Sequence, residues 1–189
     1  EKQALSAAIH ADASAPEAKP SSGALRNRYT WISSLTYFLL VCGAYGMSFW
    51  IPSILANAGM TSFAEIGLVS AIPNVAGIVA MTLISRSSDR HQERRWHLVG
   101  CFLLAAIGFA VLSVQLENVV GAIIGLTIAT MGILSALPLS WTVPTKALSK
   151  SEAAVGIAVI TSLGNLGGFV SPVVIGKISV ASGSMSGAS

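Results

Sequence analysis

The chain has 189 residues, of which 53% are hydrophobic and only 10% are charged, with a net charge of +3. A soluble domain carries about a quarter charged residues to cover its surface, so this composition excludes an ordinary soluble fold. The mild basic excess does not indicate a nucleic-acid partner. The Lys and Arg residues lie in short segments between apolar runs, as the positive-inside rule describes for membrane proteins.

The first 30 residues are polar and have no apolar period, so they are expected to form a tail. Five apolar stretches follow, each with about the 17–25 residues that a helix needs to cross the bilayer. They are Trp31–Pro52, Ile66–Ser85, Leu98–Gln115, Val119–Trp141 and Ala153–Gly176, and none contains Asp, Glu, Lys, Arg or His. Because a backbone in lipid must satisfy its own hydrogen bonds, the sequence predicts an all-α membrane protein of about five transmembrane helices.

Sequence signals at the joints support these helices. Ser62 to Glu65 and Ser149 to Glu152 both fit the S-x-x-E capping box, and each precedes an apolar run. The box satisfies backbone N–H groups where a helix begins, so the second and fifth helices are expected to start there. Pro138 and Pro144 bracket the predicted end of the fourth helix.

The distribution of Lys and Arg predicts the orientation. The loops at about 53–65 and 116–118 contain neither residue, and only Lys177 falls on their side. The other basic residues before the fifth helix occupy three segments that share the opposite side: Lys2, Lys19, Arg26 and Arg28, then Arg86, Arg90, Arg94 and Arg95, then Lys146 and Lys150. Residues 1–30 are therefore expected to be cytoplasmic, and the chain after the fifth helix is expected to lie outside.

Both ends of the chain look like cuts in a longer protein. The sequence starts without Met or a signal-peptide pattern, and it stops in a run of Ser, Gly, Ala and Met. We expect three parts: a cytoplasmic tail over 1–30, a helix bundle over 31–176, and a truncated outer-side tail over 177–189. That last part would have led to a sixth helix, because transporters are commonly built from even repeats.

A charged segment at 85–95 joins the second and third helices and admits two interpretations. It can be a solvated cytoplasmic turn with the usual basic bias. It can also be a gating loop, in which Asp89 accepts hydrogen bonds at a helix N-terminus while Arg90, Arg94 and Arg95 reach helix carbonyls or an acidic partner. Such a latch would stabilise one access state and break in the other.

The order D-R-x-x-E-R-R over Asp89–Arg95 resembles the loop motif G-x-x-x-D-R-x-G-R-R of the major facilitator superfamily, although Ser85 and Gln92-Glu93 replace its two glycines. Three further strings strengthen the resemblance: Phe49–Pro52, Gly67–Pro73 and Gly164–Pro172. Together they are similar to the anion:cation symporter branch, which carries sugar acids, tartrate, phthalate and related organic anions with protons or sodium. The resemblance implies helices seven to eleven of twelve, that is, the C-terminal half only.

This resemblance implies a fragment of a secondary active transporter in the bacterial inner membrane. It would take up an organic anion (a sugar acid, a hydroxy-dicarboxylate or an aromatic carboxylate) by alternating access, with protons favoured over sodium as the coupling ion. The expected partners are the lipid bilayer and the missing N-terminal six-helix half, and no enzyme activity, cofactor, metal or nucleic acid is expected. Because the five helices carry no ionisable group, the charged machinery is expected in the missing half.

Five neutral side chains remain as candidates for substrate binding: Tyr45, Asn74, Trp141, Thr161 and Asn165. Tyr45 can face a cavity or a neighbouring helix. Asn74 follows Pro73, so a local hydrogen bond is as plausible as a ligand contact. By resemblance, Trp141 corresponds to a tryptophan that lines the substrate cavity. Thr161 and Asn165 are four residues apart and share one helical face.

Two pairs of glycines have the spacing that places small residues on one face of a helix. Gly121-x-x-x-Gly125 and Gly164-x-x-x-Gly168 are expected to pack closely against other helices.

A membrane-embedded enzyme would need catalytic groups such as an H-E-x-x-H helix, whereas His10, His91 and His97 are expected in tail or loop. A truncated, non-transporting membrane fragment remains the other alternative.

Overall fold

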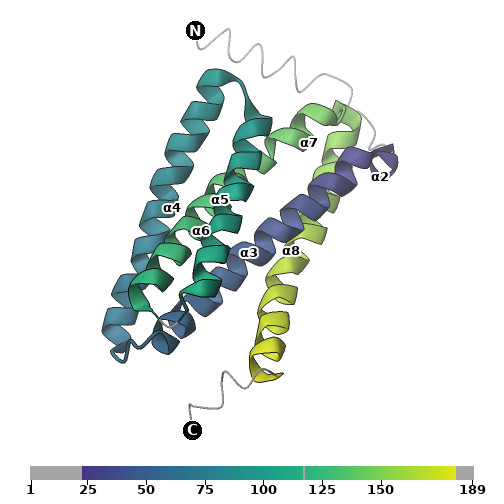
Figure 1. The fold of residues 1–189 in the computed structure, drawn as a ribbon. Helices are drawn as coiled ribbons and strands as arrows, with labels where there is room; N and C mark the ends of the chain where they lie inside the picture. Colours follow the sequence, from purple (N-terminus) through teal and green to yellow (C-terminus); the bar gives the residue numbers. More distant parts are fainter. Residues whose placement is uncertain (1–22, 117, 182–189) are drawn as a thin grey trace, which may run out of the picture.

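The structure is a computed structural model that describes residues 23–116 and 118–181. Within this part of the chain all the regular secondary structure is α-helical, and the helices run up and down between two ends of the molecule (Figure 1). The helices are α2 (Gly23–Arg26), α3 (Arg28–Asn57), α4 (Phe63–His91), α5 (Arg94–Val114), α6 (Val119–Ser140), α7 (Thr142–Ala147) and α8 (Lys150–Ala181). Five of them are long and apolar enough to cross a membrane, which agrees with the predicted number.

The helices extend beyond the predicted apolar stretches. The segment before Trp31 was predicted to be a tail, but it contains α2 and the start of α3 at Arg28. With 30 residues, α3 is about 45 Å long at 1.5 Å per residue, longer than the hydrocarbon core. The predicted stretches were bounded by hydropathy and therefore end before the first charged residue. Helical hydrogen bonds can continue beyond that point, into the headgroup region. At the other end, residues 177–181 of the expected outer tail also belong to a helix, α8. The rest of the two expected tails, 1–22 and 182–189, lies outside the described residues.

Both predicted capping boxes occur at helix starts, with different geometries. The Ser62 side chain accepts a hydrogen bond from the backbone N–H of Glu65 at 3.5 Å. At α8 the contact is reversed, because the Glu152 carboxylate accepts from the Ser149 backbone N–H at 3.3 Å and from the Ser149 hydroxyl at 2.8 Å. Each arrangement satisfies polar groups that a helix terminus leaves without an intrahelical partner.

Two other helix starts, those of α3 and α6, use Asn caps that the sequence analysis missed. Asn27 caps α3 by accepting from the Tyr29 N–H at 3.0 Å. Asn118 caps α6 by accepting from the N–H groups of Val120 and Gly121 at 3.0 and 3.3 Å. Asn is a favoured cap residue, so the signal was present in the sequence.

The predicted end of the fourth span is confirmed. α6 ends at Ser140 and the short α7 starts at Thr142, so Trp141 stands at the joint. Pro138 lies inside α6 and Pro144 inside α7. Because a proline has no backbone N–H, the two residues weaken the helical ladder on either side of Trp141.

α6 is the central helix of the bundle. In its most apolar stretch 50% of the residues are buried, against 22–33% in the other four spans. α4 and α5 pack on α6, while α8 packs mainly on α3. The largest buried cluster joins α3, α5 and α6 through Ile51, Leu55, Leu112 and Leu126.

Small residues allow α5 and α6 to approach closely. A Cβ added to Gly125 would lie 2.8 Å from the Leu112 nitrogen, and one added to Gly132 would lie 2.5 Å from the Ala105 nitrogen. In lipid, where helices gain little from apolar burial, such close contacts contribute much of the association energy. The packing role predicted for Gly125 is therefore confirmed.

The seam between α3 and α8 is also built on small residues, and it contains a polar contact. Gly164 and Gly168 pack against the rings of Tyr37 and Tyr45, as the predicted packing role of the pair requires. The Ser171 hydroxyl donates to the Cys42 carbonyl oxygen across the seam at 2.7 Å. This hydrogen bond stabilises the α3–α8 pair in addition to van der Waals contact.

Replacing Ser171 by Ala is therefore expected to lower the free energy of unfolding by about 0.6 kcal/mol, the average for an interhelical hydrogen bond in a membrane protein. The measurement is denaturant-induced loss of helical circular dichroism in mixed micelles. Ser70→Ala is the matched control, because the Ser70 hydroxyl bonds Ile66 within its own helix. Equal losses from both variants would contradict an interhelical role for Ser171.

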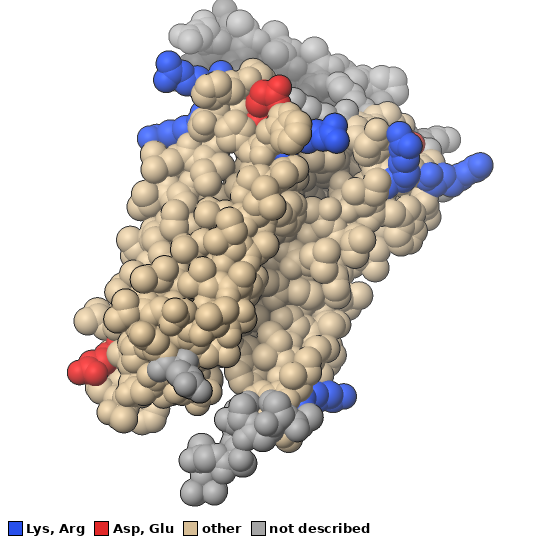
Figure 2. Space-filling view, viewed as in Figure 1, with Lys and Arg blue, Asp and Glu red and all other residues tan. Residues whose placement is uncertain are grey.

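Basic residues gather at one end of the molecule, as Figure 2 shows. This end contains α2, the turn between α4 and α5, and the joint of α7 with α8. Among the described residues the three basic segments predicted to share one side do share one end, and Lys177 lies near the opposite end of α8. Lys2 and Lys19 of the first segment lie outside the described residues. The assignment of the basic end to the cytoplasm remains a prediction from the positive-inside rule.

Candidate functional site

Trp141 lies in an aromatic contact that links three helices. Its ring meets the ring of Tyr37 edge-on, with centroids 4.9 Å apart and planes at 61°. The Tyr37 ring also packs against Gly164 of α8. A Cβ added to Gly164 would lie 2.1 Å from the Tyr37 Cδ1 atom. Tyr37 on α3 therefore connects the α6–α7 joint to α8.

A second aromatic level lies further along the same seam. Tyr45 stacks with Phe49, with ring centroids 6.4 Å apart, and both side chains are exposed. Tyr45 packs against Gly168 of α8. The two interpretations of Tyr45 thus combine, since its ring contacts a neighbouring helix and still has an exposed surface about halfway along α3.

Thr161 and Asn165 lie on α8, on either side of Gly164 in the sequence. The Thr161 hydroxyl donates to the Ile157 carbonyl oxygen at 2.7 Å, within its own helix. Asn165 follows Gly164 directly and is exposed, and among the described residues its amide has no hydrogen-bond partner. An unpartnered amide at this depth is available to a ligand or to another helix.

Asn74 lies on a different helix from these residues. It lies on α4, which packs on α6, whereas Thr161 and Asn165 lie on α8 against α3. Its side-chain N–H donates to the Ser70 carbonyl oxygen at 2.9 Å, the local hydrogen bond expected beside Pro73. The contacts of Trp141 with Tyr37 and of Tyr45 with Gly168 therefore place these two candidates at the α3–α8 seam. Thr161 and Asn165 lie on α8, and Asn74 lies on α4.

Sequence analysis missed Tyr37, although it comes eight residues before Tyr45. Residues at i, i+4 and i+8 lie on one stripe of a helix, so Tyr37 and Tyr45 face the same neighbour on two levels. Two glycines four residues apart, Gly164 and Gly168, lie opposite them on α8. The pairing of aromatic and glycine positions was the available signal.

The predicted gating loop is mostly helical. α4 runs through Asp89 and Arg90 to His91, and α5 starts at Arg94, so only Gln92 and Glu93 link the helices. The expectation that His91 and His97 lie in loops is therefore wrong, since both belong to helices, and His10 lies outside the described residues. A charged, Ser-rich sequence remains helical here because α4 continues past the hydrocarbon into a polar region.

The turn itself is held by short-range polar contacts. Gln92 has a left-handed backbone conformation with φ of 54°, at a place where the resembled motif has Gly. Asp89 forms an ion pair with Arg94 at 3.1 Å, and the Gln92 side chain donates to the Asp89 carbonyl oxygen at 2.8 Å. Asp89 thus accepts a hydrogen bond from a side chain at the N-terminus of α5. The gating role of this segment stays a prediction.

The Asp89–Arg94 pair is expected to contribute about 0.2–1 kcal/mol, because Asp89 is largely exposed to solvent. A double-mutant cycle with Asp89→Asn and Arg94→Gln, read out by unfolding in micelles, measures this coupling. The same cycle with Arg90→Gln is the control, and its coupling is expected to be near zero. Equal couplings in the two cycles would contradict a specific pair.

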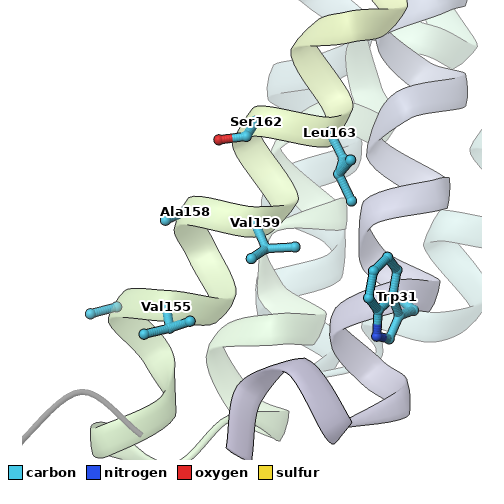
Figure 3. Close-up of a pocket in the computed structure, with 7 residues that line it drawn as sticks. Trp31, Val155, Ala158, Val159, Ser162 and Leu163 are labelled. Atoms are coloured by element: carbon cyan, nitrogen blue, oxygen red, sulfur yellow. The ribbon is translucent and has the colours of Figure 1, made fainter. Parts of the chain in front are cut away.

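Two grooves lie near the basic end. One, of about 810 Å³, is lined by the turn residues Gln92 to Arg95 together with parts of α3, α5 and α7. The other, of about 590 Å³, lies between Trp31 and α8, where Val155, Ala158, Val159, Ser162 and Leu163 face it (Figure 3). Among the lining residues of this second groove only Ser162 and the Trp31 indole have polar side-chain atoms, so it suits apolar contacts rather than an anionic ligand.

Comparisons with known proteins agree with this architecture. The family model described as Major Facilitator Superfamily matches residues 4–172. A relative from Agrobacterium vitis named "Putative tartrate transporter" is 44% identical over 154 residues, which cover 82% of this chain and 34% of that protein. "Putative metabolite transport protein NicT" from Pseudomonas putida is 34% identical and covers 94% of this chain and 41% of that protein.

A third relative, the "Inner membrane transport protein RhmT" of Escherichia coli, is 35% identical over 153 residues, covering 80% of this chain and 35% of that protein. No solved structure matches the chain. The chain spans about a third to two-fifths of the length of these curated relatives. With five apolar helices that could cross a membrane and this family match, it is part of a multi-pass membrane protein that belongs to the major facilitator superfamily.

Proposed function

We propose that the chain is the C-terminal half, without its last helix, of a secondary transporter that takes up an organic anion with protons by alternating access. The main support is a pair of polar side chains, Tyr45 and Asn165, that are exposed at the middle of two long apolar helices, α3 and α8. Asn165 has no hydrogen-bond partner among the described residues. A polar surface at that depth is costly against lipid and useful against a water-filled pathway. The relatives' names, which include tartrate and metabolite transport, support the same class.

Coupling and anion binding would need groups from the missing N-terminal half. The five predicted spans of this chain contain neither a cation for a carboxylate nor a group that titrates near neutral pH. In this proposal the seam supplies aromatic and neutral polar contacts, and the other half supplies the charges. The basic end would face the cytoplasm of a bacterial inner membrane.

Uptake of labelled glucarate into energised vesicles tests the proposal. We expect no uptake by this chain alone, and uptake that a protonophore abolishes when the chain is co-expressed with a matching N-terminal half. Protonophore-sensitive uptake by this chain alone would contradict the proposal that the N-terminal half supplies the charged groups. Failure of the co-expressed halves to take up any carboxylate would favour the alternative of a non-transporting membrane fragment.

A further inference from the structure

A small cavity of about 40 Å³ lies between α3, α4 and α6, outside the α3–α8 seam. Three of its lining residues are polar: Ser48, Asn74 and Thr130. The others are apolar, namely Ala44, Met47, Ile51, Ile133 and Leu134. A water molecule needs about 10–15 Å³ of such volume, so the cavity admits a single small polar group and excludes a ring.

The three polar side chains have unequal hydrogen-bonding capacity left. The Thr130 hydroxyl donates to the Leu126 carbonyl oxygen at 2.7 Å, so its oxygen can only accept further bonds. Asn74 uses one N–H on Ser70, which leaves its carbonyl oxygen as an acceptor and its second N–H as a donor. Among the described residues the Ser48 hydroxyl has no partner, so it can donate and accept.

This set matches a hydroxyl group better than a carboxylate. A hydroxyl can accept a bond from Ser48 while it donates to the oxygen of Asn74 or Thr130. A carboxylate only accepts, so the Thr130 oxygen would face it without a proton to give. An apolar or aromatic group would leave these polar atoms without partners, which is costly.

We propose that Ser48, Asn74 and Thr130 form a subsite for one hydroxyl group of the transported anion, an inference that rests on the proposed function. Thr130 is buried at 5% exposure, whereas Ser48 and Asn74 are exposed, so the subsite is open toward the surface that carries them. Ser48 comes three residues after Tyr45 and next to Phe49 on α3, so the hydroxyl subsite adjoins the exposed aromatic pair. Among the anions considered above, the subsite selects hydroxylated acids over aromatic carboxylates.

The test uses the co-expressed halves reconstituted in proteoliposomes, with labelled tartrate and with succinate, which has the same carbon chain but no hydroxyl. We expect kcat/KM to favour tartrate, and Ser48→Ala and Thr130→Val to lower that preference about tenfold each, as loss of one hydrogen bond implies. The helical circular dichroism of both variants in mixed micelles should match that of the unmodified protein, which shows that they fold.

Thr127→Val is the matched control, because the Thr127 hydroxyl makes the same bond to a carbonyl one turn back on α6 but does not line the cavity. Its tartrate preference should equal that of the unmodified transporter. Uptake of both acids with an unchanged preference in Ser48→Ala and Thr130→Val would overturn the subsite and leave the proposed function intact. Uptake of neither acid by the unmodified transporter would overturn the proposed function and the subsite with it.

Discussion

Replacing Gly108 by Ala is expected to destabilise the bundle by about 2–3 kcal/mol, because the added methyl group overpacks the tight α5–α6 contact. The new Cβ would lie 2.2 Å from the backbone nitrogen of Ala129 and 2.6 Å from its Cα. Backbone atoms cannot move aside as a flexible side chain can, so the two helices must separate. Unfolding in mixed micelles, followed by circular dichroism, measures the loss.

Gly100→Ala provides the matched control for this experiment. Gly100 lies on the same helix and has no atom within 4 Å of the position of an added Cβ. This variant should be as stable as the unmodified chain or slightly more stable, because Ala favours a helix over Gly. A similar stability for Gly108→Ala and Gly100→Ala would show that close α5–α6 packing does not hold the bundle together.

Replacing Gly164 by Ala is expected to reduce the rate of transport by roughly 10- to 100-fold. A side chain displaced by about 1 Å beside a bound ligand can lower a rate by that much. The new Cβ would lie 2.1 Å from the Tyr37 ring, so the ring must turn away and lose its edge contact with Trp141. Initial rates of carboxylate uptake by the co-expressed halves measure the effect.

Two further variants separate this effect from misfolding. Gly67→Ala adds a methyl group where no atom lies within 4 Å, and it should leave transport unchanged. Tyr37→Ala combined with Gly164→Ala removes the clash, so it should restore the stability of the bundle without restoring transport. Full transport by Gly164→Ala, or by the double variant, would contradict a role for the Tyr37–Trp141 contact.

Much of the fold could be predicted because membrane physics acts on local sequence. Apolar length gave the five spans, and the S-x-x-E boxes at Ser62 and Ser149 marked two of the starts correctly. The helix ends were less predictable. Residues such as Arg28 and Asp89 are charged yet helical, because only the hydrocarbon excludes charge while the backbone continues its hydrogen bonds beyond it.

The candidate site was harder to predict because it depends on which helices meet. Tyr45, Thr161 and Asn165 were predicted from their chemistry and Trp141 from the family resemblance. The partner of Trp141 could not be predicted, since Tyr37 lies on a different helix. Asn74 was grouped with them, although it lies on α4 and lines a separate cavity. Contacts between helices depend on small residues opposite large ones, a pattern that one sequence shows only weakly.

Thiol accessibility at position 165 tests most directly whether the α3–α8 seam lines an aqueous pathway. In the co-expressed halves, with Cys42 and Cys101 replaced by Ala, Asn165→Cys should react with a membrane-impermeant thiol reagent, and bound substrate should slow the reaction. Leu103→Cys is the control, because Leu103 is exposed on α5, which packs on the far side of α6 from the seam. It should not react. An Asn165→Cys variant as unreactive as Leu103→Cys would show that the seam faces lipid, and would contradict the proposed pathway.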